Sequence, residues 1–310
     1  MKKPNLFIVG QPRSGTYALH YFLSQHPEVF MSEDKEPLFF CKDFHEESDL
    51  FHKRRAFFRY RKESDYLSLF AAAKNEKFAG ESSTHYLFSK VAAREILKFN
   101  PDAKIIMMLR EPVSFLYSLY SQHFVRSQEN VGDFETALSL EKERKSGRKI
   151  PPTVYCPRFL FYSERVKYYE QIVRYYGLFD KSNIKVIIFD DFKQQNDVIY
   201  EDVLGFLNVD ADFVPVFDQV NVSKKPRFAK LNAWLLNSAF KKAIQNIIPT
   251  SLYSKIKSMG KKVLWKNQSR KPLDSSLRQK LMSEYKPEVV KISELLGIDL
   301  VKQWKYDQIV

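Results

Sequence analysis

The sequence predicts an α/β fold in which a central parallel sheet is flanked by helices. Short apolar runs of the kind that form buried strands recur between residues 6 and 189. Stretches with helical periodicity lie between these runs, as the crossovers of a parallel sheet require. With 310 residues and 44% hydrophobic residues, the chain is long enough to bury one large core.

The predicted elements follow one another along a single domain of residues 1–310. Strands are expected at residues 6–9, 78–79, 105–109 and 185–189. Helices are expected at residues 18–24, 87–99, 115–126, 134–145, 159–176, 198–207 and 275–296, the last of which ends at Gly297. Insertions are expected at residues 42–65 and 143–157, and a basic helical segment at residues 230–272.

The first predicted strand runs into the turn Gly-Gln-Pro-Arg-Ser-Gly-Thr at residues 10–16, and a helix follows. Two glycines at this spacing are typical of a P-loop-like three-layer fold, in which backbone N–H groups and a helix N-terminus hold a phosphate. The lysine of ATP-binding loops is missing, because Thr16 stands in its place and Arg13 is the only cation of the loop. The loop therefore predicts a phosphate site that does not bind ATP, and an ordinary strand-to-helix turn is the plain alternative.

A second anion site is predicted where the strand at residues 105–109 ends. Arg110 follows this strand, Pro112 suits the first turn of a helix, and Ser118 lies two turns along that helix. A guanidinium and a hydroxyl group placed in this way hold one phosphate from two sides. A nucleoside triphosphatase would need an acidic magnesium ligand after this strand, where the chain has Arg110. The alternative is that Arg110 and Ser118 only make contacts at helix ends.

Two anion sites without a metal-binding carboxylate suit a nucleotide that is phosphorylated at two separate positions. In residues 10–16 and 107–118 the chain resembles the sulfotransferases that use 3'-phosphoadenosine 5'-phosphosulfate. The segment Lys-Glu-Pro-Leu-Phe-Phe at residues 35–40 resembles the part of heparan-sulfate and bacterial carbohydrate sulfotransferases that carries a catalytic glutamate. Looser likeness at residues 80–86, 189–192 and 221–227 extends the resemblance over essentially the whole chain. The Pro-Arg-Ser-Gly-Thr form of the loop is similar instead to tyrosylprotein sulfotransferases, since the glycan enzymes usually have Lys there.

The resemblance implies a catalytic role for two residues. Glu36 is expected to act as the general base, and Arg13 to stabilise charge on the leaving oxygen. An ordinary glutamate titrates near ~4.3, so Glu36 needs desolvation by the apolar residues at 38–40 to be an effective base. Glu33 and His85 are the alternatives for the base. The residues expected to bind the donor are Arg13, Ser14, Gly15, Thr16, Tyr17, Arg110, Ser118, Lys224, Lys225 and Arg227, and no metal is expected.

The resemblance also implies a function. We expect a sulfotransferase that acts on a hydroxyl or amine of a carbohydrate or glycolipid, with a tyrosine, phenolic or other small-molecule acceptor as the alternative. The insertions at residues 42–65 and 143–157 are expected to bind the acceptor. Two rival functions are an ATP-dependent phosphotransferase and a non-catalytic protein that binds acidic glycans or nucleic acid. The missing loop lysine and Arg110 oppose the phosphotransferase, and no nucleic-acid partner is expected.

The formal net charge of +13 is concentrated in one segment. Residues 219–273 hold 13 Lys and Arg and no Asp or Glu, and the rest of the chain balances at 37 of each sign. This asymmetry indicates an acidic partner. Residues 251–271 mix apolar with basic side chains, which fits a peripheral contact with an anionic membrane, a groove for a glycan, or an ordinary surface helix.

Cysteine content and the N-terminus bear on where the protein is found. Cys41 and Cys156 have no disulfide or zinc-site pattern around them, so free thiols are expected. The apolar run at residues 6–9 is too short for the core of a signal peptide or for a membrane span. We therefore expect a cytoplasmic protein, with the membrane contact just described as a peripheral association.

Overall fold

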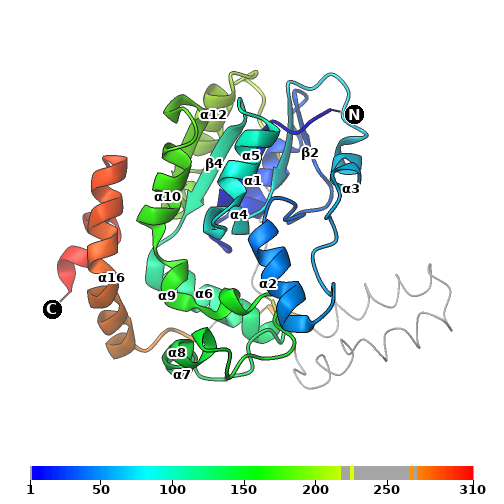
Figure 1. Ribbon diagram of the computed structural model, residues 1–310. Helices are drawn as coiled ribbons and strands as arrows, with labels where there is room; N and C mark the ends of the chain where they lie inside the picture. Colours follow the sequence, from blue (N-terminus) through cyan, green and yellow to red (C-terminus); the bar gives the residue numbers. More distant parts are fainter. Residues whose placement is uncertain (1, 218–223, 227–264, 268–270, 310) are drawn as a thin grey trace.

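The computed structural model (Figure 1) describes residues 2–217, 224–226, 265–267 and 271–309. Its centre is a five-stranded, entirely parallel sheet with the strand order β2-β3-β1-β4-β5. The strands are β1 (Leu6–Gly10), β2 (Val29–Met31), β3 (Phe78–Ser82), β4 (Lys104–Leu109) and β5 (Ile184–Ile188). The predicted α/β class with a central parallel sheet is therefore confirmed. Strand β2 was not predicted, because three residues are too few to show a period.

Helices cover both faces of this sheet, so the fold has three layers. Side chains alternate along each strand, and the two faces bury different sets of residues. Leu6 and Ile8 of β1 pack with helices α1 (Thr16–Leu23) and α12 (Asn196–Leu207). Phe7 and Val9 lie in the larger cluster on the other face. That cluster includes residues of α4 (His85–Phe88), α5 (Ala92–Phe99), α6 (Pro112–Val125), α10 (Tyr168–Tyr176) and α16 (Ser275–Leu296).

The remaining helices lie around this framework. They are α2 (Lys42–His52), α3 (Glu63–Leu67), α7 (Phe134–Ser139), α8 (Glu141–Lys145), α9 (Tyr162–Arg165), α11 (Phe189–Gln194) and α17 (Leu300–Gln303). Figure 1 shows α10 and α16 side by side, and these two helices are in contact. Strands β6 (Lys224–Pro226) and β7 (Trp265–Asn267) form a separate antiparallel pair. Within the described residues no helix has both the length and the apolarity needed to cross a membrane.

Three predicted helices are interrupted. The predicted helix 134–145 is divided at Leu140 into α7 and α8. In the other two, side-chain hydrogen bonds explain how the interruption is tolerated. The predicted helix 87–99 is wrong as one element, because Ser89 ends α4 and its hydroxyl accepts from the N–H groups of Val91 and Ala92. The predicted helix 159–176 is a 3-10 turn followed by α9 and α10. Between α9 and α10, Gln171 Nε2 donates to the carbonyl of Arg165. The predicted C-terminal helix 275–296 is confirmed, and Gly297 ends it with φ 67°.

The two expected insertions differ in structure. Residues 42–65 contain α2 and the beginning of α3. Residues 143–157 form the end of α8 and a loop in which Val154 and Cys156 are fully buried, so this segment packs into the domain. Cys41 and Cys156 are both buried free thiols, as predicted. Most of the basic segment 230–272, including nearly all of 251–271, lies outside the described residues.

Candidate functional site

A cavity of about 1130 Å³ lies where the carboxyl ends of the five strands meet. Each strand supplies a residue to its wall from the segment that follows it. These residues are Arg13 after β1, Glu36 after β2, Thr84 after β3, Arg110 after β4 and Phe189 after β5. Ligands of open α/β sheets bind at this edge, because successive crossovers leave the space beyond the strand ends unfilled.

The turn from β1 into α1 has two positions that require glycine, Gly10 against β4 and Gly15 against α11. Gly10 has φ 136°, and a Cβ atom there would lie 2.3 Å from the backbone oxygen of Met108. Gly15 has φ 84°, and a Cβ atom there would lie 3.0 Å from Phe192 and 3.1 Å from Phe189. The glycine spacing seen in the sequence is thus a requirement of this turn.

The polar groups of this loop fit a phosphate. Gly15 is the N-cap of α1, and within the described residues no side chain caps the first turn of that helix. Ser14 is fully buried, and its hydroxyl has no hydrogen-bond partner in the part of the chain that the structure describes. Buried hydroxyl groups are nearly always paired, so a phosphate oxygen is a suitable partner for Ser14. Thr16 begins the helix beside it.

Arg13 and Arg110 connect the two predicted anion sites. The backbone of Arg13 is left-handed, with φ 67°, and its carbonyl oxygen accepts a hydrogen bond of 2.8 Å from Nη1 of Arg110. The guanidinium of Arg110 also lies 4.9 Å from the ring centroid of Phe189. Burial lowers the pKa of both arginines, but a guanidinium remains charged. Ser118 is buried on α6 and lines the same cavity, so the structure brings together both halves of the predicted anion site.

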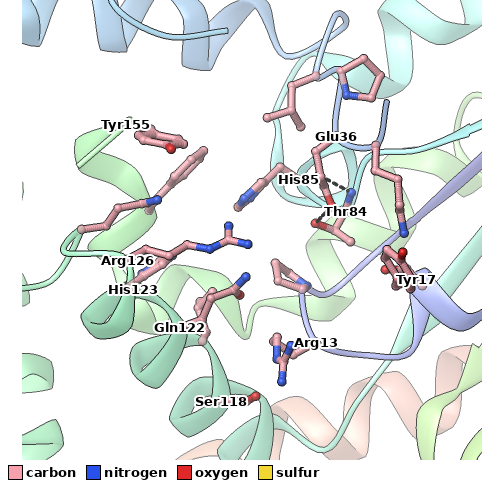
Figure 2. A pocket seen from close by; sticks show the side chains of 18 of the residues that line it. Arg13, Tyr17, Glu36, Thr84, His85, Ser118, Gln122, His123, Arg126 and Tyr155 are labelled. Atoms are coloured by element: carbon pink, nitrogen blue, oxygen red, sulfur yellow. Dashed lines mark hydrogen bonds between the residues drawn. The ribbon is translucent and has the colours of Figure 1, made fainter. Parts of the chain in front are cut away.

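Glu36 is held rigidly in the cavity wall (Figure 2). Its carboxylate accepts one hydrogen bond from the N–H of Thr84 at 3.0 Å and one from the Thr84 hydroxyl at 2.8 Å. Its own N–H donates to the carbonyl of Ser82. Burial raises the pKa of Glu36, whereas the Thr84 hydroxyl and Lys35 oppose this rise. The carboxylate is thus a stronger base than an exposed glutamate, in the direction that the sequence predicted.

A second carboxylate, Glu81, supports the segment that carries Glu36. Glu81 is fully buried on β3 and accepts hydrogen bonds from Tyr66 at 3.0 Å, Tyr86 at 2.6 Å and Ser83 at 2.7 Å. The Ser83 hydroxyl also accepts from the N–H of Leu38, two residues after Glu36. Burial raises the pKa of Glu81 to about 7. Glu81 was not among the predicted site residues, although it lies in the segment 80–86 that resembles known sulfotransferases.

The other candidate bases lie in the same cavity. Glu33 is exposed and has no hydrogen-bond partner among the described residues. His85 lines the cavity with its ring stacked on Phe159, 4.2 Å between centroids and 1° between planes. Its Nδ1 lies 3.2 Å from Nη1 of Arg165, and burial lowers the pKa of His85 well below the usual histidine value.

The remaining residues that were predicted to bind the donor differ in how much of them the structure describes. Tyr17 lines the cavity and is 46% exposed, with Lys35 Nζ 4.6 Å from its ring centroid. Lys224 and Lys225 belong to β6, and the structure describes only their backbone. Arg227 lies outside the described residues.

Sequence reasoning missed several residues of the cavity. Gln122, His123 and Arg126 line it from α6 and from the residue that caps α6 (Figure 2). The signal for two of them was present, because Gln122 and Arg126 follow Ser118 by four and eight residues and so share its helix face. The segments with the predicted insertions also contribute to the wall. Their lining residues are Phe57, Phe58, Arg59, Tyr60 and Tyr155.

Comparison with known proteins gives one family. A family model described as "Sulfotransferase family" matches residues 4–150. The chain is 36% identical over 123 residues to the human bifunctional heparan sulfate N-deacetylase/N-sulfotransferase 2, which is 39% of this chain and 13% of that protein. It is 29% identical over 178 residues to mouse carbohydrate sulfotransferase 15, which is 44% of this chain and 30% of that protein. The matched region therefore spans less than a third of either curated relative.

A solved structure matches the chain over nearly its whole length. The sulfotransferase from Alicyclobacillus acidocaldarius superimposes with a TM-score of 0.71 and 25% sequence identity, covering 98% of this chain and 100% of that one. The P-loop-like three-layer prediction agrees with this likeness.

Proposed function

We propose that this chain, which matches a sulfotransferase family model over residues 4–150, transfers a sulfuryl group from 3'-phosphoadenosine 5'-phosphosulfate to a hydroxyl or amine of a carbohydrate. The observation that carries the proposal is the meeting of Arg13, Glu36 and Arg110 in one cavity at the carboxyl ends of the strands. A carbohydrate acceptor is supported by the names of the curated relatives, a heparan sulfate enzyme and a carbohydrate sulfotransferase.

The loop and the second anion site would hold the two ends of the donor. The Ser14 hydroxyl, the N–H groups at Gly15 and Thr16 and the start of α1 suit the 5' side. Arg110 and Ser118 suit the 3'-phosphate. The donor supplies an activated sulfuryl group whose leaving group is a nucleoside bisphosphate.

Glu36 and Arg13 would then divide the chemistry between them. Figure 2 shows them reaching into the cavity from different sides. Glu36 accepts the proton of the acceptor hydroxyl or amine as that oxygen or nitrogen bonds to sulfur. Arg13 donates to the bridging oxygen, which becomes negative as its bond to sulfur breaks. The products are the sulfated acceptor, the bisphosphate and a protonated Glu36.

Glu36 is a better candidate for the base than Glu33. The Thr84 bonds fix the Glu36 carboxylate in one orientation, and burial raises its pKa. Glu33 is exposed, and no hydrogen bond among the described residues holds it in a reactive position. Position and basicity together favour Glu36.

The proposal is tested by incubating the protein with a radiolabelled sulfate donor and a panel of glycans, glycolipids, phenols and tyrosine peptides. We expect label on a glycan or glycolipid. Glu36→Gln and Arg13→Ala should each lower turnover by roughly 10²–10⁴-fold while circular dichroism shows an unchanged fold. Glu33→Gln, the matched change of the competing carboxylate, should keep wild-type turnover. Full activity of Glu36→Gln would remove it as the base.

Donor binding separates this function from that of an ATP-dependent phosphotransferase. Calorimetry should show that the protein binds 3',5'-adenosine bisphosphate and that ATP with magnesium binds far more weakly, since the loop lacks its lysine. In Arg110→Ala the calorimetric signal of 3',5'-adenosine bisphosphate binding should disappear, because the change removes the cation of the second anion site. Tighter binding of ATP than of the bisphosphate would support the phosphotransferase instead.

A further inference from the structure

Arg165, at the end of α9, is a fully buried cation with very few partners. Its side chain is 0% exposed, and its guanidinium lies 4.1 Å from the ring centroid of Phe88. Within the described part of the chain, its Nε and Nη2 atoms have no hydrogen-bond partner, whereas Nη1 contacts Nδ1 of His85 at 3.2 Å. Burying an incompletely paired charge costs several kcal/mol, so a neutral side chain would serve packing better.

The contact with Arg165 determines where His85 carries its proton. A guanidinium has only donors, so Nδ1 of His85 must accept this hydrogen bond. The proton of the neutral imidazole is therefore on Nε2. Burial and the nearby side chains of Arg165, His123 and Arg126 keep the pKa of His85 low, so the ring stays neutral.

The ring of His85 lines the cavity, and with Nδ1 hydrogen-bonded to the buried Arg165 its Nε2–H is the group left for a ligand. One face of the ring stacks on Phe159, and Phe44 approaches it at 86° between ring planes. Figure 2 shows the ring projecting into the cavity, between the Glu36–Thr84 pair and the guanidinium of Arg126. A histidine in this arrangement presents an N–H donor beside Glu36 and offers no lone pair to a substrate proton.

We propose that His85 is a neutral hydrogen-bond donor of the acceptor site and that Arg165 is the positioning residue that fixes its Nε2–H form. The Nε2–H group donates to an oxygen of the acceptor next to the hydroxyl or amine that attacks sulfur. The acceptor therefore carries an oxygen substituent beside its reacting group, as adjacent positions of a sugar ring do. This inference rests on the proposed function and removes His85 as an alternative base.

The form of His85 is measured directly by ¹⁵N NMR of the full chain labelled at histidine. The chain has six histidines, and the signal lost in His85→Gln identifies this one. We expect Nδ1 to resonate as an unprotonated nitrogen and Nε2 as a protonated one, unchanged from neutral pH to about pH 5. In Arg165→Met the ring should populate both neutral forms, and Arg165→Lys, which keeps a cationic donor, should restore the wild-type spectrum. A protonated Nδ1, or a ring that becomes charged between pH 6 and 7, would overturn the proposal.

Kinetics on the acceptor identified by the labelling panel test the donor role. His85→Phe keeps the stack on Phe159 but removes the donor, so kcat/KM for the acceptor should fall by about tenfold while bisphosphate affinity is unchanged. His85→Gln keeps an amide N–H near the same place and should recover most of this loss. The low-pH limb of the kcat/KM profile should persist in both variants, because it belongs to Glu36.

The two experiments fail in different ways. Full activity of His85→Phe, or loss of the low-pH limb in both variants, would overturn the donor role although sulfation itself is observed. Absence of any sulfated acceptor together with the expected NMR spectrum would overturn the proposed function and the donor role, and leave the fixed Nε2–H form of His85 established.

Discussion

The segment that carries Glu36 has an unfavourable backbone at two residues. Glu36 and Leu38 both have φ 55°, in the left-handed region that side chains with a Cβ atom rarely adopt. The Ser82 carbonyl accepts from the N–H of Glu36, and the Ser83 hydroxyl accepts from that of Leu38. Such strain persists only where surrounding contacts compensate for it, and it is common at functional sites. Here the hydrogen bonds to Ser82 and Ser83 at the end of β3 compensate for the backbone strain. The strained backbone places the Glu36 carboxylate against Thr84.

The raised pKa of Glu36 leads to a prediction about pH. A base must be ionised, so kcat/KM should increase as pH rises through the pKa of Glu36, above the ordinary glutamate value of ~4.3. The Thr84 hydroxyl stabilises the ionised form of Glu36, so Thr84→Val should move this low-pH limb of the kcat/KM profile to higher pH. The measurement is kcat/KM against pH for the wild type, Thr84→Val and the surface control Thr136→Val on α7, outside the cavity wall. A limb that stays in place, or moves to lower pH, in Thr84→Val would contradict the assignment.

Gly10 leads to a prediction about stability. Gly10→Ala should lower the free energy of unfolding by at least about 2 kcal/mol, because its Cβ atom would lie 2.3 Å from the Met108 oxygen and its φ is 136°. Gly205→Ala is the matched control, since no atom lies within 4 Å of its Cβ position in α12, and it should stabilise by ~0.5–1 kcal/mol. Urea unfolding measures both. Equal stability of the two variants would show that the loop can move away from β4.

Among the elements, a buried ion pair joins the chain after α6 to α8. Arg144 donates to both oxygens of Glu129 at 2.8 Å, and both side chains are completely buried. Tyr162, the first residue of α9, donates to the same carboxylate at 3.0 Å. The pair and Tyr162 therefore connect the loop after α6 to α8 and α9, two helices that are too short to be stable alone. Helix α9 carries Arg165.

Removal of one partner should be costly at this site. Glu129→Gln leaves the Arg144 guanidinium buried and without its counter-ion, so we expect a loss of roughly 3–5 kcal/mol in the free energy of unfolding. Glu135→Gln breaks the exposed pair with Lys280 and should change it by less than about 1 kcal/mol. Chemical unfolding distinguishes the two. A small effect of Glu129→Gln would mean that water reaches Arg144.

At the scale of the whole molecule, the C-terminal residues fix the beginning of α6. The carboxylate of Glu111 caps α6 through the N–H groups of Val113 and Ser114, both at 2.8 Å. It also accepts from Tyr306 at 2.6 Å and from Arg278 of α16 at 3.2 Å. Residues 167 and 195 positions after Glu111 thus position the helix that carries Ser118 and follows Arg110. The donor site and the C-terminal helix are parts of one packed unit.

Tyr306→Phe tests this long-range support. The change leaves a buried carboxylate with one donor fewer, so the free energy of unfolding should fall by about 1–3 kcal/mol. Because Glu111 lies next to Arg110, calorimetry should also show weaker binding of 3',5'-adenosine bisphosphate. Tyr169→Phe, on an exposed side chain of α10, is the control and should change neither quantity. Lower stability with unchanged bisphosphate affinity would show that the Tyr306 contact does not support the donor site.

Features that depend on neighbouring residues could be predicted from the amino-acid sequence alone. Four of the five strands, the C-terminal helix with its glycine stop, the loop at residues 10–16 and the pair Arg110 and Ser118 were readable because local periodicity, glycine conformation and helix spacing specify them. The central parallel sheet followed from the alternation of strands and helices. Strand β2 and the breaks in three helices were not readable, since packing and single side-chain hydrogen bonds override local propensity there.

Which side chains meet in the site depends on how distant elements pack against one another. Arg110 donates a hydrogen bond to the carbonyl of Arg13, which lies 97 positions earlier in the sequence. Thr84 donates to Glu36, 48 positions earlier, and Arg165 donates to His85, 80 positions earlier. These contacts depend on the strand order β2-β3-β1-β4-β5, which places the ends of strands far apart in the sequence at one edge. Strand order results from the packing of whole elements, so no short stretch of sequence encodes it. The residue types of the site were therefore predictable, whereas the contacts that orient Glu36 and His85 were not.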